Sequence, residues 1–437
     1  MLVGVDVGGT FTDAVVFDGS TLYSAKTPTT PGDESSGVRT AIRAALATAN
    51  VSPGSIERFV HGMTVGTNAL LEERGAPTCL VATAGFEDLL EIGRQNRPSL
   101  YRLCAPKPRP LVESGRVGVA ERTGPDGVIT PLTAEEVDLA VSAVAAAGAD
   151  SVALCLLFAH VDPTHERRIA AAIRARLPGV HVSASHEVLP RFREYERCST
   201  TVIDAYISPL LGSYLRDLAA AAAADGLPEP EIMRSSGGVA PWQEAAEHGA
   251  WSVLSGPAGG AVGASLIASL TAGGNAIGLD MGGTSCDVCV VEGGAVRRTG
   301  ARTIAGRVIQ LPMVDVHTVG AGGGSVAWRD HGGALRVGPR SAGAEPGPAC
   351  YGRGGTQPTV TDANLLLGRL AAGSRLAGGV TLDPDAARAA VGALAAELGL
   401  DELATAEGIV RLADAEMARA LRVVTVERGI DPRGFAL

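Results

Sequence analysis

The sequence predicts an α/β protein in which two duplicated domains flank a cleft. Two observations lead to this fold class: short Val-rich runs alternate with stretches of helical character, and one strand–turn–strand segment occurs twice. At 437 residues the chain is also too long for a single hydrophobic core, and 46% of its residues are apolar. We therefore expect two or three domains.

The N-terminal segment predicts a β-hairpin. Residues 2–8 and 11–18 are short Val-rich runs joined by a Gly-Gly-Thr turn. A helix is expected to follow over residues 33–48.

Residues 132–147 predict a helix with a defined start. Thr133 is a suitable N-cap, and Glu136 follows three residues later, which is the spacing of a capping box. The elements expected after it are a buried strand over 151–158, a helix over 163–177, a strand over 181–185, a helix over about 194–205, a helical stretch over about 383–428 and the start of a buried strand at 434–437.

The most informative feature is an internal repeat. Val3–Leu22 reads VGVDVGGTFTDAVVFDGSTL, and Ile277–Val296 reads IGLDMGGTSCDVCVVEGGAV; at an offset of 274, eight of the twenty positions are identical. This offset is far too long for a solenoid repeat and indicates duplicated domains. We expect one domain over residues 1–185 and a second over 186–437, incomplete at its C-terminal end because the chain stops within an apolar run.

The repeated turn has the chemistry of a phosphate-binding loop. Phosphate oxygens accept hydrogen bonds from several backbone N–H groups at once, and paired glycines let the backbone approach without obstruction by Cβ. The turn joins strand to strand and contains no Gly-Lys-Ser/Thr, so it is neither a Rossmann fingerprint nor a Walker loop. The expected nucleotide-binding residues are Asp6, Gly8, Gly9, Thr10, Thr12, Asp280, Gly282, Gly283 and Thr284.

The aspartates of the repeat predict a magnesium ion. Asp6 and Asp280 end the first strand of each copy, and carboxylates there repel phosphate unless a divalent cation lies between them. Mg²⁺ held mostly through water satisfies this condition. Asp13 and Asp287 begin the return strands and are candidate catalytic residues that hold magnesium water or orient a nucleophile. A duplicated hairpin of this kind is typical of the actin-like, hexokinase-like and heat-shock-chaperone-like ATP-binding fold, which is ribonuclease H-like. The alternative is an ordinary Gly-Gly hairpin, which two copies make improbable.

Two further segments carry weaker signals. The loop 320–325 is glycine-rich, and its Gly322 and Gly323 are expected to contact the nucleotide or the opposing domain; a flexible loop is the alternative. Asp315 and His317 share one face of a strand and are candidate metal ligands, although an ordinary strand pair is the better interpretation.

Composition excludes several classes of function. The net charge is −10 and no Lys/Arg block occurs, so nucleic acid and anionic membranes are poor partner hypotheses. Seven scattered cysteines argue against a disulfide framework and for a reducing compartment. We expect a cytoplasmic protein.

At this point the sequence resembles the hydantoinase A / 5-oxoprolinase family, which includes ATP-binding subunits of acetone and acetophenone carboxylases. The segments that carry the resemblance are VHGMTVGTNALLEERGA (60–76), SHEVLPRFREYERCSTTVIDAYISP (185–209), SSGGV (235–239), SGPAGG (255–260), DMGGTSCDV (280–288), DVHTVGAGGGS (315–325) and GPRSAGAEPGPACYGRGGTQPTVTDANLLLGRL (338–370).

The resemblance implies the actin-like ATPase fold and ATP-dependent activation of a carbonyl or lactam oxygen. It implies ring opening of a cyclic amide such as hydantoin, N-methylhydantoin or 5-oxoproline, and a hydantoinase B-type partner in an oligomer. It also places His61 near the cleft, where it would bind substrate or act as an acid; a structural histidine is the alternative. Arg94 and Arg97 are candidates to clamp a substrate carboxylate, with solvated or paired arginines equally favoured.

Three other functions stay open. One is the ATP-using subunit of a ketone carboxylase, in which an enol and bicarbonate are the phosphorylated species. Another is a non-catalytic, actin-like regulatory ATPase, and a further one is a small-metabolite kinase. The first shares its ATP site with the cyclic amidases, so the sequence does not separate them.

Overall fold

A computed structural model describes residues 1–437 apart from 10, 31–32, 98, 103–107, 272 and 375–379. The chain folds as two discontinuous units. Unit 1 comprises Met1–Gly62, Gly256–Arg297 and Val314–Leu437, and unit 2 comprises Met63–Ser255 and Arg298–Met313. Residues 185 and 186, the expected domain boundary, both lie in unit 2.

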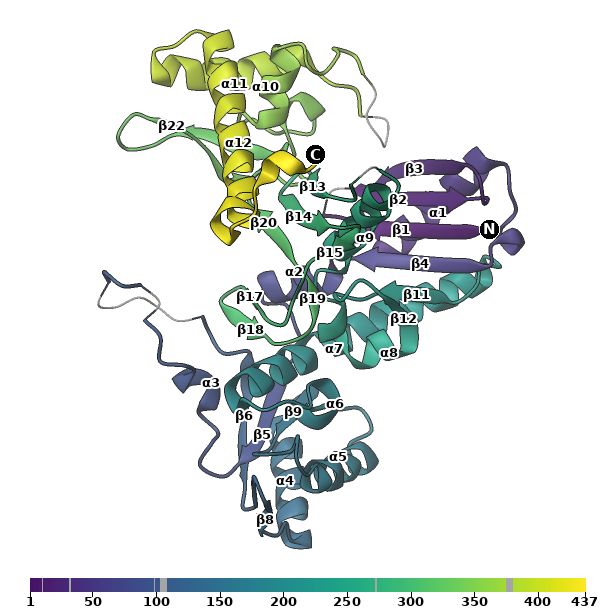
Figure 1. Cartoon of the computed structure of the whole chain (residues 1–437), viewed down its shortest axis with the longest axis vertical. Helices are drawn as coiled ribbons and strands as arrows, with labels where there is room; N and C mark the ends of the chain where they lie inside the picture. The colour runs from purple at the N-terminus through teal and green to yellow at the C-terminus, as the bar shows by residue number, and fades with distance from the viewer. Residues whose placement is uncertain (10, 31–32, 98, 103–107, 272, 375–379) are drawn as a thin grey trace. The chain divides into compact units, whose positions relative to one another are not determined.

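The first part of unit 1 is a sheet in which neighbouring strands follow the order β4-β1-β2-β3 (Figure 1). Its strands alternate buried and more exposed residues, and Val3, Val5 and Val7 are buried. Its helix begins after Asp33, whose carboxylate accepts a hydrogen bond from the backbone N–H of Ser36 at 3.2 Å. The predicted hairpin and helix are both confirmed. The elements are β1 (Leu2–Val7), β2 (Phe11–Phe17), β3 (Leu22–Pro28), α1 (Glu34–Ala49), η1 (Pro53–Ser55) and β4 (Arg58–Met63).

The second part of unit 1 repeats the hairpin. Its elements are α9 (Ser255–Ser269), β13 (Ala276–Met281), β14 (Cys286–Glu292), β15 (Ala295–Val296), β19 (Met313–Val314) and β20 (Val316–Val319). Strands β13 and β20 both pair antiparallel with β14. The small side chains of Ala258 and Ala261 let α9 pack closely against Cys289 of β14. Cys286 belongs to a different cluster, so the two cysteines face opposite ways, as expected for a strand.

The described residues in the C-terminal part of unit 1 form two strands and three α-helices, together with short 3₁₀ turns. They are β21 (Ser325–Arg329), β22 (Leu335–Ser341), η3 (Ala349–Tyr351), α10 (Val360–Leu366), α11 (Pro384–Leu398), α12 (Glu402–Val424), η5 (Val426–Arg428) and η6 (Pro432–Gly434). The helical stretch expected over 383–428 is two helices, because Gly399 has a φ of +68° and ends α11, and Asp401 caps α12. The buried strand expected at 434–437 is a single bridge: Ala436 pairs with Ala276, and Leu437 is exposed.

Unit 2 is built around a parallel sheet with the order β10-β9-β5-β6. Alternate residues of the buried strand β5 serve two different cores: Cys79 and Val81 pack with helices α4 and α5, whereas Leu80 and Ala82 pack with α7. Its elements are α2 (Val65–Leu71), β5 (Thr78–Thr83), α3 (Leu89–Ile92), β6 (Val112–Val119), β7 (Arg122–Gly124), β8 (Gly127–Thr130), α4 (Ala134–Ala147), β9 (Ser151–Cys155), α5 (Thr164–Arg176), β10 (His181–Ala184), α6 (Ser185–Val188), α7 (Glu194–Ala224), β11 (Pro230–Met233), β12 (Val239–Pro241), α8 (Trp242–Glu247), η2 (Gly249–Ser252), β16 (Arg298–Thr299), β17 (Arg302–Ile304) and β18 (Arg307–Ile309).

Two predictions in unit 2 need correction. Thr133 caps α4 as expected, accepting from the N–H of Glu136 at 3.1 Å. The capping box does not close, because the Glu136 carboxylate instead accepts from the N–H of Ala120. Helix α7 continues to Ala224, through Pro209, whereas the sequence predicted an end near residue 205. Eighteen of its residues are buried, and this packing outweighs the hydrogen bond lost at proline.

The main segment of unit 2 begins and ends at one place. The Ser255 hydroxyl donates a hydrogen bond to the Met63 carbonyl at 2.9 Å and accepts one from the Met63 N–H at 3.2 Å. The two ends of a segment that is almost two hundred residues long therefore meet side by side.

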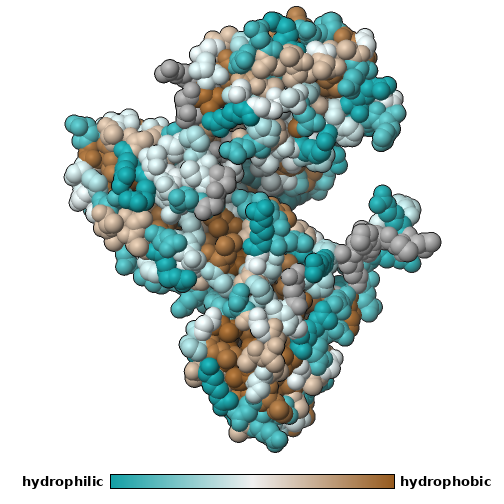
Figure 2. Space-filling model, turned by 180° about the vertical axis from the view of Figure 1, so that it is seen from behind, coloured by the Kyte–Doolittle hydropathy of each residue, from teal (hydrophilic) through white to brown (hydrophobic). Residues whose placement is uncertain are grey.

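The surface is mixed in character. On the face drawn in Figure 2, hydrophilic residues surround several areas of hydrophobic ones. No helix among the described residues is long and apolar enough to span a membrane.

Candidate functional site

The two copies of the repeat adopt the same hairpin, and both belong to unit 1. In the first copy Asp6 lies opposite Asp13, and in the second Asp280 lies opposite Asp287. The turns also match. The Gly8 N–H donates to the Phe11 carbonyl at 3.0 Å, and the equivalent bond from Gly282 to Ser285 is 2.9 Å. The sequence repeat is therefore a structural repeat down to strand register.

Each hairpin places two carboxylates on one face. Residues directly opposite each other in an antiparallel pair lie on the same side of the sheet, and like charges in such positions repel. The pKa of Asp6 is raised to about 6, first because the surrounding protein limits its hydration and then because Asp13, Asp280 and Asp287 repel its negative charge. Lys26 opposes this shift. Carboxylates from both hairpins thus act on one another within unit 1.

Asp6 lies in a recess that only glycine permits. A Cβ atom added to Gly62 would lie 3.0 Å from Asp6 Oδ1, and one added to Gly256 would lie 2.9 Å from the same oxygen. Gly256 stands in the first turn of α9. Protein atoms crowd the carboxylate on these sides, yet the residue keeps a solvent-exposed surface. A charged group that is partly desolvated but still open to water is suited to binding a cation.

Asp13 and Asp287, the aspartates of the two return strands, differ in their side-chain partners. The Lys26 ammonium contacts both oxygens of Asp13, at 2.7 and 2.5 Å. Asp287 has no lysine in the equivalent place, and instead accepts a hydrogen bond from the Thr318 hydroxyl at 2.5 Å. Asp13 therefore has a neutralising partner, whereas Asp287 is held by a neutral donor.

The glycine-rich loop supports the second turn. Gly323 N–H donates to the Gly282 carbonyl at 3.0 Å, Gly324 N–H donates to the Gly283 carbonyl at 2.7 Å, and Gly322 N–H donates to the Ser325 hydroxyl. A Cβ on Gly322 would lie 2.6 Å from the Gly283 oxygen, so only glycine fits there. These amides have partners within the protein, and the nucleotide contact expected at Gly322 and Gly323 is not supported by their geometry.

The three threonines of the expected site have different surroundings. Thr10 lies outside the described residues. Thr12 is buried, with its hydroxyl 3.3 Å from that of Thr29, so it does not face a ligand. Thr284 is exposed on the second turn, as a phosphate donor has to be.

The catalytic interpretation of His61 needs correction. Its side chain is fully buried, and Nδ1 lies 3.3 Å from the Val5 carbonyl. Burial lowers the pKa of His61 to about 4, so the ring is neutral at physiological pH. A side chain without access to solvent cannot contact substrate or deliver a proton to it, and the structure gives His61 a structural position beside β1.

The metal interpretation of Asp315 and His317 finds no geometric support. Asp315 pairs with Arg428, and His317 lines a different hollow, against α12. Over the described parts of the chain, no three His, Cys, Asp or Glu side chains are grouped closely enough to enclose a metal ion.

Sequence reasoning missed Lys26, Thr29 and Thr318. Lys26 lies opposite Asp13 in the strand pairing, and the Thr29 hydroxyl donates to the Gly8 carbonyl at 2.8 Å. Extending the strand alternation of the first hairpin into the following strand, β3, would have placed Lys26 opposite Asp13. Thr318 follows only from the pairing of β20 with β14. Arg94, a candidate clamp, makes two hydrogen bonds to Glu196, so its guanidinium already has a carboxylate.

Comparison with known proteins identifies relatives along the whole chain. The "Hydantoinase/oxoprolinase" family model matches residues 197–437, and its "N-terminal region" model matches residues 2–177. The caprolactamase alpha subunit of Pseudomonas jessenii is 38% identical, covering 100% of this chain and 64% of the relative. The acetophenone carboxylase gamma subunit of Aromatoleum aromaticum is 34% identical, covering 100% of this chain and 62% of the relative.

Two solved structures share the fold. An ATP-dependent caprolactamase from Pseudomonas jessenii matches with a TM-score of 0.84 at 37% identity, and a nucleotide-free acetone carboxylase matches with a TM-score of 0.86 at 28% identity. Each match covers 100% of this chain and 64% of the other. The chain thus spans just under two thirds of the length of these relatives. It belongs to the hydantoinase/oxoprolinase family.

Proposed function

We propose that this chain binds ATP on its two hairpins and uses it to phosphorylate the carbonyl oxygen of a cyclic amide, so that the ring can be opened. The observation that carries the proposal is the pair of Gly-Gly turns of identical register in one unit, with four carboxylates that repel one another. Unit 1 is then a duplicated actin-like nucleotide fold. Both solved relatives are ATP-dependent enzymes, which supports the choice of nucleotide.

The carboxylates fit a magnesium ion that is held largely through water and phosphate. Limited hydration raises the pKa of Asp6, as does the negative charge of Asp13, Asp280 and Asp287, which Lys26 offsets only in part; a divalent cation would balance that charge further. The described residues contain no cluster of three ligands, which suits an ion that keeps its own waters. Asp6 and Asp280 would hold these waters. Bound Mg²⁺ would supply charge neutralisation on the transferring phosphoryl group.

The chain's own residues would act by positioning the γ-phosphate and the carbonyl oxygen relative to each other. Amide resonance makes a lactam carbonyl a poor electrophile, and a phosphorylated oxygen becomes a leaving group. The amides of the two turns would hold the phosphates, and alignment of the γ-phosphate with the carbonyl oxygen supplies much of the rate. Asp287 suits the orienting role better than Asp13, because Lys26 already neutralises Asp13.

A ketone carboxylase subunit is the second candidate. The same ATP site would serve it, with an enol and bicarbonate as phosphoryl acceptors. The caprolactamase subunit is 38% identical to this chain, the acetophenone carboxylase subunit 34% and the 5-oxoprolinase of Arabidopsis thaliana 32%. The caprolactamase supports the amide, and the carboxylase subunit, which exceeds the oxoprolinase in identity, keeps the ketone as the second candidate. A non-catalytic regulatory ATPase and a small-metabolite kinase are the remaining alternatives, and hydrolysis by the first would not respond to small substrates.

A partner protein is part of the proposal. The relatives named above are subunits, which supports assembly with a second polypeptide; a hydantoinase B-type subunit is the candidate. A cytoplasmic location stays a prediction.

The deciding experiment measures ADP release by the chain with its partner subunit. We would compare caprolactam, 5-oxoproline, hydantoin and N-methylhydantoin with acetone and acetophenone, each with and without bicarbonate. Stimulation by one cyclic amide, independent of bicarbonate, is expected. Stimulation by a ketone only when bicarbonate is present would establish the carboxylase instead. The Asp287→Asn variant controls for contaminating ATPases, since it retains the hairpin but loses the orienting carboxylate.

Stimulation of hydrolysis by a protein client, with no response to any small substrate, would favour the regulatory ATPase. Accumulation of a phosphorylated metabolite would point to a kinase.

A further inference from the structure

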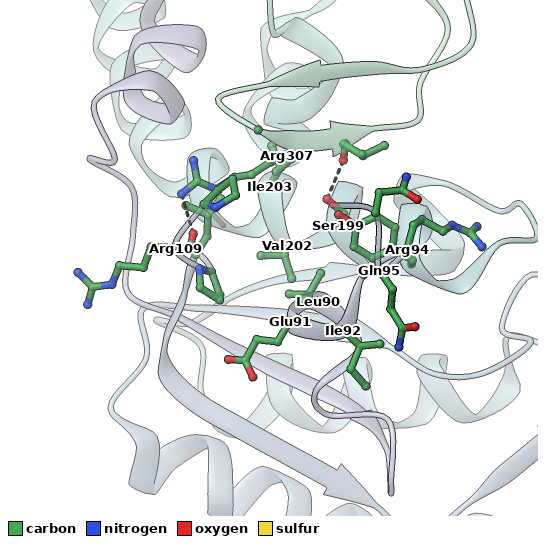
Figure 3. Close-up of a pocket in the computed structure, with 18 of the residues that line it drawn as sticks. Leu90, Glu91, Ile92, Arg94, Gln95, Arg109, Ser199, Val202, Ile203 and Arg307 are labelled. Carbon is green, nitrogen blue, oxygen red and sulfur yellow. Dashed lines mark hydrogen bonds between the residues drawn. The ribbon is translucent and has the colours of Figure 1, made fainter. Parts of the chain in front are cut away.

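Unit 2 contains a cavity of about 690 Å³ that the proposed ATP chemistry does not use (Figure 3). Its walls come from α3 and the segment after it, from residues 108–111, from the first turns of α7, and from the turn that leads into β18. All of these segments belong to unit 2. The volume falls within the range of about 300–1,000 Å³ that is typical of small-molecule sites.

The interior of the cavity is apolar. Leu90 and Val202 point toward its centre, beside Ile203 (Figure 3). Leu111 and Val308 add to the same surface. Val202 and Ile203 are buried members of the core around α7, whereas Leu90 packs against that core and is only partly buried. An apolar molecule of moderate size would therefore be held by displacement of water from these side chains.

One cationic side chain borders this apolar space with hydrogen-bond capacity to spare. Arg307 has a side chain that is 9% exposed. A guanidinium has five N–H donors. Nη2 donates to Glu73 at 2.5 Å and to the Arg109 carbonyl at 2.7 Å, and Nη1 donates to the Ala305 carbonyl at 3.3 Å. Nε has no acceptor in the described structure.

Leaving a buried donor without an acceptor is unfavourable, and a ligand oxygen placed there would supply the missing hydrogen bond. The guanidinium is also fixed in place. Glu73 holds one side of it, and the turn before it is tightly seated, because Gly306 has a φ of +75° and a Cβ there would collide with Pro108. A donor held in this way loses little freedom when a ligand binds.

Charge at the cavity favours an anion. Four of the lining side chains are arginines, at positions 94, 97, 109 and 307, and the one lining acid, Glu91, is paired with Arg116. Arg97 has no ion pair among the described residues, unlike Arg94, which is bound to Glu196. A carboxylate gains a charge-assisted hydrogen bond from a guanidinium, which is stronger than the bond that a neutral amide would accept.

From these observations we infer that the cavity binds a small monocarboxylic acid with an apolar body, whose carboxylate is recognised by Arg307 and whose body lies against Leu90, Val202 and Ile203. This site lies within unit 2 and is separate from the hairpins of unit 1. It does not depend on the proposed phosphoryl transfer.

The test is calorimetric titration of the whole chain with octanoate, octanamide and octylamine. Saturable octanoate binding is expected, with octanamide about tenfold weaker or more and octylamine weaker still, a tenfold ratio being about 1.4 kcal/mol. Leu90→Trp should abolish octanoate binding by filling the cavity. Arg307→Met should weaken it about tenfold or more, and Arg307→Lys should recover only part of it because the fixed planar donors are lost.

The matched control is Arg216→Met, which removes one exposed arginine from the same helix α7 outside the cavity and should bind octanoate like the parent chain. Circular dichroism and thermal unfolding would verify that each variant folds. The inference is overturned if octylamine binds as well as octanoate, if Leu90→Trp folds and still binds, or if the parent chain shows no octanoate binding.

Discussion

The two hairpins of unit 1 share a backbone and differ in their supports. Among the described residues, the first turn accepts a side-chain hydrogen bond from Thr29 at the Gly8 carbonyl, and a Cβ on Gly9 would meet nothing within 4 Å. The second turn is held by backbone, because the loop 322–324 bonds to the carbonyls of both Gly282 and Gly283. A duplicated motif can thus keep its register while its two copies are supported by different contacts.

The charges diverge in the same way. In the first copy Lys26 neutralises Asp13, and Asp6 is crowded into the recess between Gly62 and Gly256. In the second copy Asp287 accepts a hydrogen bond from the Thr318 hydroxyl, which occupies the strand position that Lys26 has in the first copy. Under the proposed function, the first hairpin would balance charge near a bound cation and the second would orient the reacting group.

The largest expected effect separates the two return-strand aspartates. Asp287→Asn should lower substrate-dependent ADP release about 100-fold or more, within the range for loss of a positioned catalytic group. Asp13→Asn should cost about tenfold or less, because Lys26 already neutralises Asp13. Steady-state kinetics with the activating substrate would measure both. Equal losses in kcat would show that the two hairpins do not have different roles in the reaction.

The next effect is on stability. Gly322→Ala places a Cβ against the Gly283 carbonyl, which is backbone and cannot swing away, so the free energy of unfolding should fall by about 1–3 kcal/mol. Gly320→Ala is the matched control on the same loop, since its nearest neighbour would be 3.8 Å away. Urea unfolding would compare the two. Similar urea midpoints would show that the close contact between the loop 322–324 and the second turn does not stabilise the protein.

Gly9→Ala tests the open turn. Because the new methyl group meets no protein atom, the thermal midpoint should hardly change. A methyl group there would obstruct the approach of phosphate, and we expect nucleotide affinity to fall about tenfold, or 1.4 kcal/mol. Titration with a non-hydrolysable ATP analogue would measure it. Unchanged affinity would mean that the first turn does not touch phosphate.

Thr29→Val should produce a smaller loss. It removes the hydroxyl that donates to the Gly8 carbonyl, and about 1 kcal/mol of stability should be lost. Thr48→Val is a suitable control, because that hydroxyl bonds only within the exposed face of α1. Chemical unfolding of both variants would show whether the first turn relies on its side-chain support.

The smallest expected effect is on the pH dependence of stability, measured with metal-free protein. The pKa of Asp6 is about 6 in the folded state, against an ordinary value of 3.8, so the folded chain binds this proton more tightly than the unfolded chain does. Stability from this group is therefore greatest below about pH 4, falls as pH rises toward 6 and stays low above it. Asp6→Asn should remove that slope, leaving the variant relatively more stable at neutral pH.

Asp18→Asn gives the opposite sign as a control. Hydrogen bonds from the N–H groups of Thr21 and Ser20 lower the pKa of Asp18 to about 2, so its contribution is lost as pH falls. Thermal midpoints across pH would separate the two variants. A flat difference between Asp6→Asn and the parent chain would contradict the charge crowding around Asp6.

The sequence was informative where a feature is local. The first hairpin, its repeat, the helix that follows the first copy and the cap at Thr133 all follow from neighbours along the chain. It was uninformative where distant segments meet. The supports of the turns, the recess around Asp6 and the burial of His61 depend on contacts between strands far apart in sequence. The predicted end of α7 near residue 205 was wrong because tertiary packing carries the helix on to Ala224.

The meeting of Met63 and Ser255 has a consequence for synthesis. During synthesis on the ribosome, β1 to β4 emerge long before α9 and the second hairpin. Unit 1 therefore cannot complete its fold until these later segments have been made. Once the intervening segment folds, it draws residues 62 and 256 together and replaces a very long loop by a short one. This lowers the entropy that unit 1 loses when its two halves join. Folding of the inserted segment therefore helps to join the two parts of unit 1. A mutation that prevents this segment from folding should leave those two parts unassembled.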